Sequence, residues 1–182
     1  RNLLANSGAF SSPSPLDRNH RDYLFAVLAF YKDASFAAMA QAQMVRPDGQ
    51  VDRGSVRYLQ QTLGTQSVAL AKQAYTDPRL TNAASKEVFV RLALNFAGAD
   101  AQATEFYAKT ISDKSLTGNH RSNLIEDLNE DGFPDPRNLT ANDLPLVENR
   151  ITLIEQLAPG AMDKVNADAF QIHVVTRGVQ VP

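Results

Sequence analysis

The chain consists largely of long segments that lack glycine and proline and carry apolar residues at helical spacing. Residues 21–44 form the first of these segments and are predicted to be one long helix, in which Leu24, Val27, Leu28 and Tyr31 recur at helical spacing. Because the same face of an α-helix returns every 3.6 residues, this period predicts amphipathic helices that pack on one another. Short clusters of Pro, Asp and Gly, such as residues 46–52, separate the segments and predict turns.

The same pattern continues along the chain. A second helix should run from Val56 to Tyr75 with a bend at Gly64, and residues 83–97 are apolar around most of the helical circumference, which indicates a central buried helix. Shorter helices are predicted over 101–111 and 120–128. Pro145 is tolerated only in the first turn of a helix, so the next helix should begin no earlier than about Asn142 and end at Leu157. We expect a short helix over 162–169.

These segments predict an all-α fold of antiparallel helical hairpins, with about six or seven helices and a short extended C-terminal tail. The hairpins would form either a helical repeat or an irregular bundle. Residues 1–15 are rich in Ser and Pro and are expected to be a flexible N-terminal arm or linker. Residues 16–170 are predicted to form a single helical domain, and residues 171–182 an extended tail.

Composition narrows the classes of function. The net charge is -2 and no run of Lys or Arg occurs, so the chain lacks the basic footprint of a nucleic-acid binder. No apolar stretch approaches the roughly 20 residues that a membrane helix needs. The chain has no cysteine, which excludes disulfides, thiolate catalysis and thiolate metal sites. We therefore expect a protein partner, no nucleic acid and no membrane span.

A turn-and-helix pattern recurs at three places, which begin at Asp77, Asp113 and Asp135. The segments are DPRLTNAASKEVFVRLAL, DKSLTGNHRSNLIEDL and DPRNLTANDLPLVENRI, and each has Asp, then Leu-Thr, then Asn before an apolar helix. The pattern resembles HEAT-like or armadillo-type helical repeats over about residues 77–157. That resemblance implies stacked helix pairs that present a concave surface to a partner. The alternative is capping chemistry that a plain helical bundle would also use.

The segment DLNEDGFPDPRN, residues 127–138, has oxygen-bearing side chains at alternate positions followed by a glycine. Calcium takes six to eight oxygen ligands, and this spacing curls a chain around one ion. The segment resembles the calcium loops of EF-hand and dockerin modules. The resemblance implies these ligands: Asp127, Asn129, Asp131, the Phe133 carbonyl and Asp135.

Two positions of this segment depart from the calcium-loop pattern. Asn138 stands where EF-hands carry a bidentate Glu, and Pro134 takes a position that is commonly hydrophobic. The alternative interpretation is a helix that ends at about Asn129, with Gly132 beyond it and the acids in a solvated turn. Both interpretations stay open at the level of sequence.

No catalytic constellation is recognisable in the sequence. The three histidines, at positions 20, 120 and 173, lack the spacing that places two imidazoles on one helix face. The acids Glu87, Glu105, Glu126 and Glu155 fall on separate predicted helices. The aromatic residues of the first segment are predicted to be core, and these are Tyr23, Phe25, Phe30, Tyr31 and Phe36.

These sequence features are compatible with three hypotheses about function, each from a different class. The first is a noncatalytic helical interaction or scaffold module that binds another protein and requires no cofactor. The second is a calcium-stabilised helical module of an exported or surface protein. The third is an enzyme whose site is assembled from scattered helical residues. The missing catalytic motifs favour the first.

Overall fold

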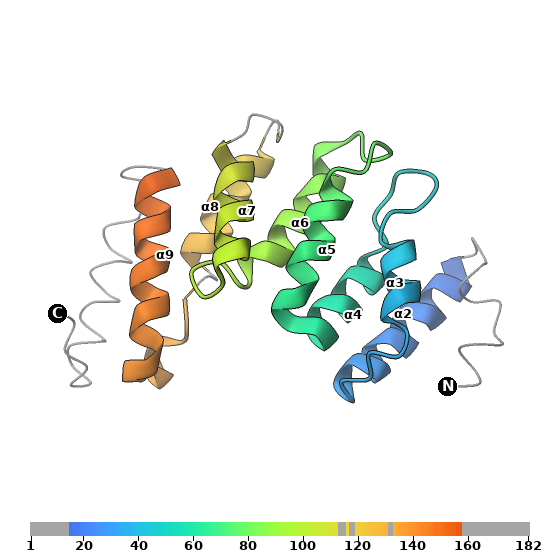
Figure 1. Cartoon of the computed structure of the whole chain (residues 1–182), viewed down its shortest axis with the longest axis horizontal. Helices are drawn as coiled ribbons and strands as arrows, with labels where there is room; N and C mark the ends of the chain where they lie inside the picture. The colour runs from blue at the N-terminus through green and yellow to red at the C-terminus, as the bar shows by residue number, and fades with distance from the viewer. Residues whose placement is uncertain (1–14, 113–115, 117–118, 131–132, 158–182) are drawn as a thin grey trace. The chain divides into compact units, whose positions relative to one another are not determined.

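The computed structural model describes residues 15–112, 116, 119–130 and 133–157. In that part the chain is helical and has no strand, with one isolated antiparallel bridge between Val45 and Val51 (Figure 1). The predicted all-α class is confirmed. The predicted arm up to residue 14, the helix over 162–169 and the tail over 171–182 lie outside the described residues. Within them, no helix is both long and apolar enough to cross a membrane.

Contacts between Cα atoms divide the chain into two compact units, Arg1–Leu92 and Ala93–Pro182. The boundary falls in the last turn of one helix, α6 (Ala83–Leu94). The single helical domain predicted for residues 16–170 stays a prediction.

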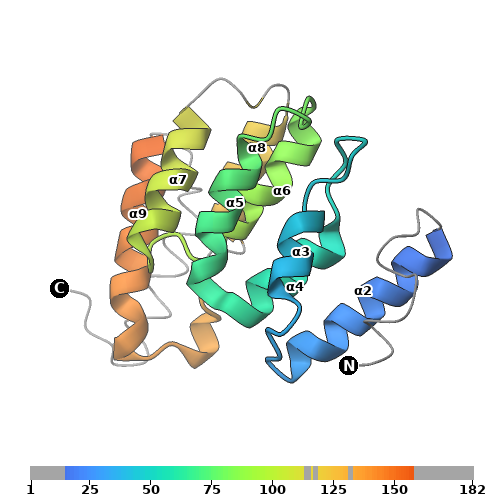
Figure 2. The same ribbon diagram turned by 45° about the vertical axis from the view of Figure 1, so that its right-hand side comes forward.

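Unit 1 holds α2 (Pro15–Phe30), α3 (Ala37–Gln43), α4 (Arg53–Leu63), the short 3-10 helix η2 (Gly64–Gln66), α5 (Ser67–Tyr75) and most of α6. Helices α2 and α3 both pack on α4, and α4 contacts α5. Figures 1 and 2 both place α3 and α4 between α2 and α5. Helix α2 therefore has one face on α4 and a second face directed away from the rest of the described unit.

The prediction of one continuous helix over 21–44 is wrong, because α2 ends at Phe30 and α3 begins at Ala37. Lys32 has a φ of 54°, its N–H donates to the Ala29 carbonyl at 3.0 Å, and the Asp33 N–H donates to the Leu28 carbonyl at 2.9 Å. This pair of bonds is the Schellman motif that ends many helices. Glycine usually takes the left-handed position, so a lysine there left no signal in the sequence.

The second predicted helix bends at Gly64, as the sequence indicated. Helix α4 ends at Leu63, Gly64 has a φ of 56°, and η2 leads into α5. A side chain at that φ would be strained, so glycine permits the change of direction. The predicted turn over 46–52 is also confirmed, with the Arg46 N–H donating to the Gln50 carbonyl at 2.9 Å.

Unit 2 holds α7 (Ala101–Ser112), α8 (His120–Glu130), two 3-10 turns, η3 (Pro136–Asn138) and η4 (Ala141–Asp143), and α9 (Leu144–Leu157). Helix α9 packs against α7 and α8, and the Tyr107 hydroxyl donates to the Leu124 carbonyl at 2.6 Å. Pro145 lies in the first turn of α9, as predicted from its missing N–H.

Two of the recurring turns share one local geometry. In each Asp-Pro-Arg turn the aspartate Oδ1 accepts the arginine backbone N–H at 2.9 Å, at Asp77 with Arg79 and at Asp135 with Arg137. The bonds from Arg79 lower the pKa of Asp77 to about 2. The leucine that follows each turn is buried, and these are Leu80, Leu116 and Leu139. The turn recurs, while the HEAT-like stacking stays a prediction.

Candidate functional site

Helix α2 is fixed to α4 by a buried ion pair. Arg21 and Asp52 are each 5% exposed, and the Arg21 guanidinium donates to the Asp52 carboxylate. The same carboxylate accepts the Ser55 N–H at 2.9 Å and so caps the N-terminus of α4. One aspartate therefore starts α4 and binds α2. The position of α2 depends on this contact, because an unpaired charge at this depth would be strongly destabilising.

An aromatic stack lies next to the ion pair. The rings of Phe25 and Tyr58 stack with centroids 4.6 Å apart, and both side chains are buried. The Tyr58 hydroxyl donates to the Asp33 carbonyl at 2.6 Å and accepts the Phe36 N–H at 3.3 Å. Burial raises the pKa of Tyr58, so the phenol stays protonated near neutral pH. Tyr58 thus ties α4 to the turn that follows α2.

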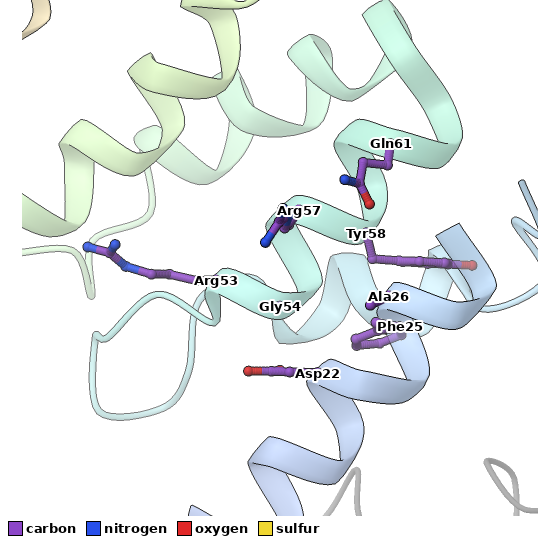
Figure 3. Close-up of a pocket in the computed structure, with 8 residues that line it drawn as sticks. All are labelled: Asp22, Phe25, Ala26, Arg53, Gly54, Arg57, Tyr58 and Gln61. Carbon is purple, nitrogen blue, oxygen red and sulfur yellow. The ribbon is translucent and has the colours of Figure 1, made fainter. Parts of the chain in front are cut away.

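A small pocket opens between α2 and α4, with a volume of about 200 Å³. Figure 3 shows its lining: α2 supplies Asp22, Phe25 and Ala26, and α4 supplies Arg53, Gly54, Arg57, Tyr58 and Gln61. The two helices approach closely here, because a Cβ atom on Gly54 would lie 2.0 Å from the Asp22 carboxylate oxygen Oδ1. Pockets for cofactors and drug-sized ligands are usually ~300–1,000 Å³, so this one matches a single side chain better.

The outward surface of α2 is apolar from Tyr23 to the end of the helix. Tyr23 is 71% exposed, Val27 39%, Phe30 80% and Tyr31 73%. The spacing of four and three residues places Tyr23, Val27 and Phe30 on one face of α2, opposite the buried Arg21, Phe25 and Ala29, and Tyr31 directly follows the end of the helix. We call Tyr23, Val27, Phe30 and Tyr31 the α2 outer face. The Phe30 and Tyr31 rings meet edge to face, with centroids 5.2 Å apart.

The prediction that the aromatics of the first segment are core is therefore wrong for three of the five. Phe25 is buried and Phe36 is half-buried, whereas Tyr23, Phe30 and Tyr31 are exposed. Helical spacing allows two choices of buried face when both faces are apolar. Arg21 determines which face of α2 is buried, because its pairing with Asp52 turns the Phe25 side of the helix toward α4.

The predicted calcium loop is only partly within the described residues. Asp127 and Asn129 lie in the last turns of α8, which runs to Glu130, and Asp131 lies outside the described residues. The Asp135 carboxylate accepts the Arg137 N–H and pairs with the Arg137 guanidinium at 3.0 Å. In the part that the structure describes, no group of three or more acidic or histidine side chains could hold a metal ion. The calcium site stays a prediction.

Phe133 has a packing role whatever its carbonyl binds. Its side chain packs on a small apolar cluster of unit 2 formed around Leu139 and Val147. Packing of this side chain fixes the position of Phe133 beside the cluster. Any calcium loop here would have to displace Arg137 from Asp135.

The other titratable candidates do not form a site in the described part. His20 is exposed on α2 and His120 begins α8, while His173 lies outside the described residues. Glu87 pairs with Arg91 at 2.6 Å, one turn along α6. Glu105, Glu126 and Glu155 are exposed on α7, α8 and α9.

A buried arginine also fixes α9 within unit 2. Arg150 is 6% exposed, and its guanidinium donates to the Ala97 carbonyl at 2.8 Å and to the Asn95 carbonyl at 3.2 Å. Burial lowers the pKa of Arg150. These carbonyls follow the end of α6, where a cation is favoured by the helix dipole. The contact joins α9 to the segment that follows α6.

Sequence reasoning missed the pocket, the outward aromatics and the two arginines at the pocket rim. Arg53 and Arg57 are spaced four residues apart, which is a visible signal for one helix face. What lies opposite them depends on the pairing of α2 with α4, which no local pattern specifies. Comparison of the chain with family models, with curated proteins and with solved structures found no match.

Proposed function

We propose that the chain is a noncatalytic helical interaction module that binds another protein through the α2 outer face. The observation that carries the proposal is the exposure of Tyr23, Val27 and Phe30 on one face of α2, with the exposed ring of Tyr31 directly after it. Tyr and Phe are enriched at interfaces, where they bury large apolar areas with little loss of side-chain freedom. An isolated exposed apolar residue would not support this proposal, but a contiguous face does.

The size of the face supports a partner rather than chance exposure. An aromatic side chain can bury about 150–250 Å², so the three rings together offer on the order of 400 Å². A stable interface buries about 800 Å² on each partner. The α2 outer face would therefore form about half of one side of such an interface, with the neighbouring surface of α2 and α4 forming the rest.

The support beneath the face favours binding with little rearrangement. The Arg21–Asp52 pair and the Phe25–Tyr58 stack hold the opposite side of α2. A surface fixed in advance loses less conformational entropy when a partner binds.

The proposal is tested by placing a photo-crosslinking amino acid at position 27 of the chain, and at position 152 of α9 as the matched control. We expect one defined protein to crosslink at position 27 and not at 152. That protein, once purified, should bind the chain with a Kd raised more than about tenfold by Phe30→Ser, the effect of removing one aromatic anchor. Equal crosslinking at both positions, or binding that ignores Phe30→Ser, would overturn the proposal.

A further inference from the structure

We propose that the partner of the α2 outer face is an amphipathic helix with acidic residues along one edge, and that Arg53 and Arg57 bind those carboxylates. The inference rests on the proposed function and names the chemistry of its partner. It combines two features of unit 1, the apolar α2 outer face and the basic rim of the pocket beside it.

The pocket and the α2 outer face are continuous around the helix. Asp22 and Ala26 line the pocket, and each is followed directly by a residue of the outer face, Tyr23 and Val27. Ala26 and Phe30 are one turn apart and therefore neighbours on the surface of α2. A helix laid along the α2 outer face would have its flank beside the pocket.

The side chains at the rim carry an excess of positive charge. Arg53 and Arg57 are exposed, lie one turn apart on α4 and both line the pocket (Figure 3). Neither has an ion pair or a side-chain hydrogen bond among the described residues, whereas Arg21, Arg79, Arg91 and Arg137 each pair with a carboxylate. One acid opposes them, Asp22, whose Oδ1 lies 3.9 Å from the Arg21 Nε.

The spacing of the two arginines matches a helix as the occupant. Residues four apart on a helix lie about 5–6 Å apart at Cβ, so acids three or four residues apart on a partner helix would meet both guanidinium groups. Guanidinium groups bind carboxylates through two parallel hydrogen bonds, which fixes the direction as well as the contact. Charges at the rim of an interface act mainly on orientation and on the rate of association.

A second copy of the chain fits this surface less well. The outer side of α2 between residues 19 and 31 carries no acid apart from Asp22, so a second α2 cannot supply an acidic edge. The outward surface of α9 has acids, Glu148 and Glu155, but no exposed large apolar side chain to cover the aromatic rings. The α2 outer face and the two arginines beside it are therefore complementary to a partner helix that carries both apolar and acidic residues.

The test uses the whole chain and two synthetic amphipathic helical peptides as probes. Both peptides carry the same Leu-rich face, and one has Glu at two positions four apart on one edge where the other has Gln. Binding of each is followed by fluorescence anisotropy at low and at high salt. We expect the Glu peptide to bind about 3- to 10-fold tighter than the Gln peptide, as two partly exposed ion pairs would give, with the preference reduced by salt.

Variants of the chain separate this inference from the proposed function. The double variant Arg53→Gln/Arg57→Gln should abolish the preference for Glu, Phe30→Ser should weaken both peptides equally, and Arg137→Gln, an exposed arginine of unit 2, should change neither. Equal binding of both peptides would overturn the acidic edge and leave the proposed function standing. No binding of either peptide, or a dimer of the free chain that Phe30→Ser dissociates, would overturn the helical partner.

Discussion

Helices α2 and α9 are built alike on their buried sides and differ on their outward sides. Each contributes a buried arginine to its own unit, Arg21 on α2 and Arg150 on α9. The exposed residues of α9 beyond its first turn are all polar, and they are Glu148, Asn149, Thr152, Glu155 and Gln156. The exposed surface of α2 has polar residues in its first half, Asn19, His20 and Asp22, but carries Tyr23, Val27 and Phe30 toward its end, where the exposed Tyr31 follows. The outward surface of α9 is polar whereas that of α2 is apolar from Tyr23 onward, and this difference supports the proposed role of the α2 outer face in binding.

The two arginines are also satisfied in different ways. Arg21 meets a carboxylate, Asp52, whereas Arg150 meets the backbone carbonyls of Ala97 and Asn95. Losing the partner of an ion pair leaves a buried charge, while losing an arginine that meets carbonyls leaves neutral acceptors. The comparison predicts an order of effects on stability.

The largest effect is expected from Asp52→Ala, which leaves Arg21 buried without its carboxylate and removes the cap of α4. The free energy of unfolding of unit 1 should fall by about 3–5 kcal/mol, measured by urea denaturation. The double variant Arg21→Met/Asp52→Ala should recover part of that loss, because it removes both charges. A double variant less stable than Asp52→Ala would contradict the ion-pair explanation.

A smaller loss is expected from Arg150→Met, which keeps the apolar stem and removes the hydrogen bonds from the guanidinium to the Ala97 and Asn95 carbonyls. The free energy of unfolding of unit 2 should fall by about 1–3 kcal/mol. Glu155→Gln on the outward surface of α9 is the matched control and should change it by less than about 0.5 kcal/mol. Losses of equal size for Arg150→Met and Asp52→Ala would remove the distinction between the two helices.

Removing the Tyr58 hydroxyl with Tyr58→Phe should cost about 1–2 kcal/mol, because the Asp33 carbonyl loses its donor. The wild-type pKa is raised above 10.0, so the neutral phenol contributes its full stability below pH 10.0 and loses it as the pH rises through the folded-state pKa. The difference between wild type and variant should therefore shrink in alkaline urea titrations. Tyr31→Phe, on the exposed side of α2, is the control, and a difference independent of pH would count against a buried phenol.

The smallest effect on stability is expected from Tyr23→Ser or Phe30→Ser. Both side chains are mostly exposed, so the free energy of unfolding should change by less than about 0.5 kcal/mol. Phe25→Ala, on the opposite side of the same helix, should cost about 3–5 kcal/mol. If Phe30→Ser lowered the free energy of unfolding by more than about 1.5 kcal/mol, the α2 outer face would be packed against the chain itself and would not be available to a partner.

Local features of the sequence predicted much of the fold. The helical class, the bend at Gly64, the turn over 46–52 and the place of Pro145 in α9 follow from backbone chemistry that acts within a few residues. The end of α2 at Lys32 was not predicted, because the sequence does not distinguish a lysine in the left-handed conformation from any other lysine.

The candidate site was decided by tertiary contacts. Residues 21–31 are apolar on more than one side, and their pattern alone cannot tell which side is buried. The pairing of Arg21 with Asp52, residues far apart in sequence, turns one side of α2 to α4 and leaves Tyr23, Phe30 and Tyr31 outward. The sequence by itself determined that there would be a helix here, because helix formation is local. Only the tertiary structure decided which face is free to bind, because burial depends on contacts between distant segments.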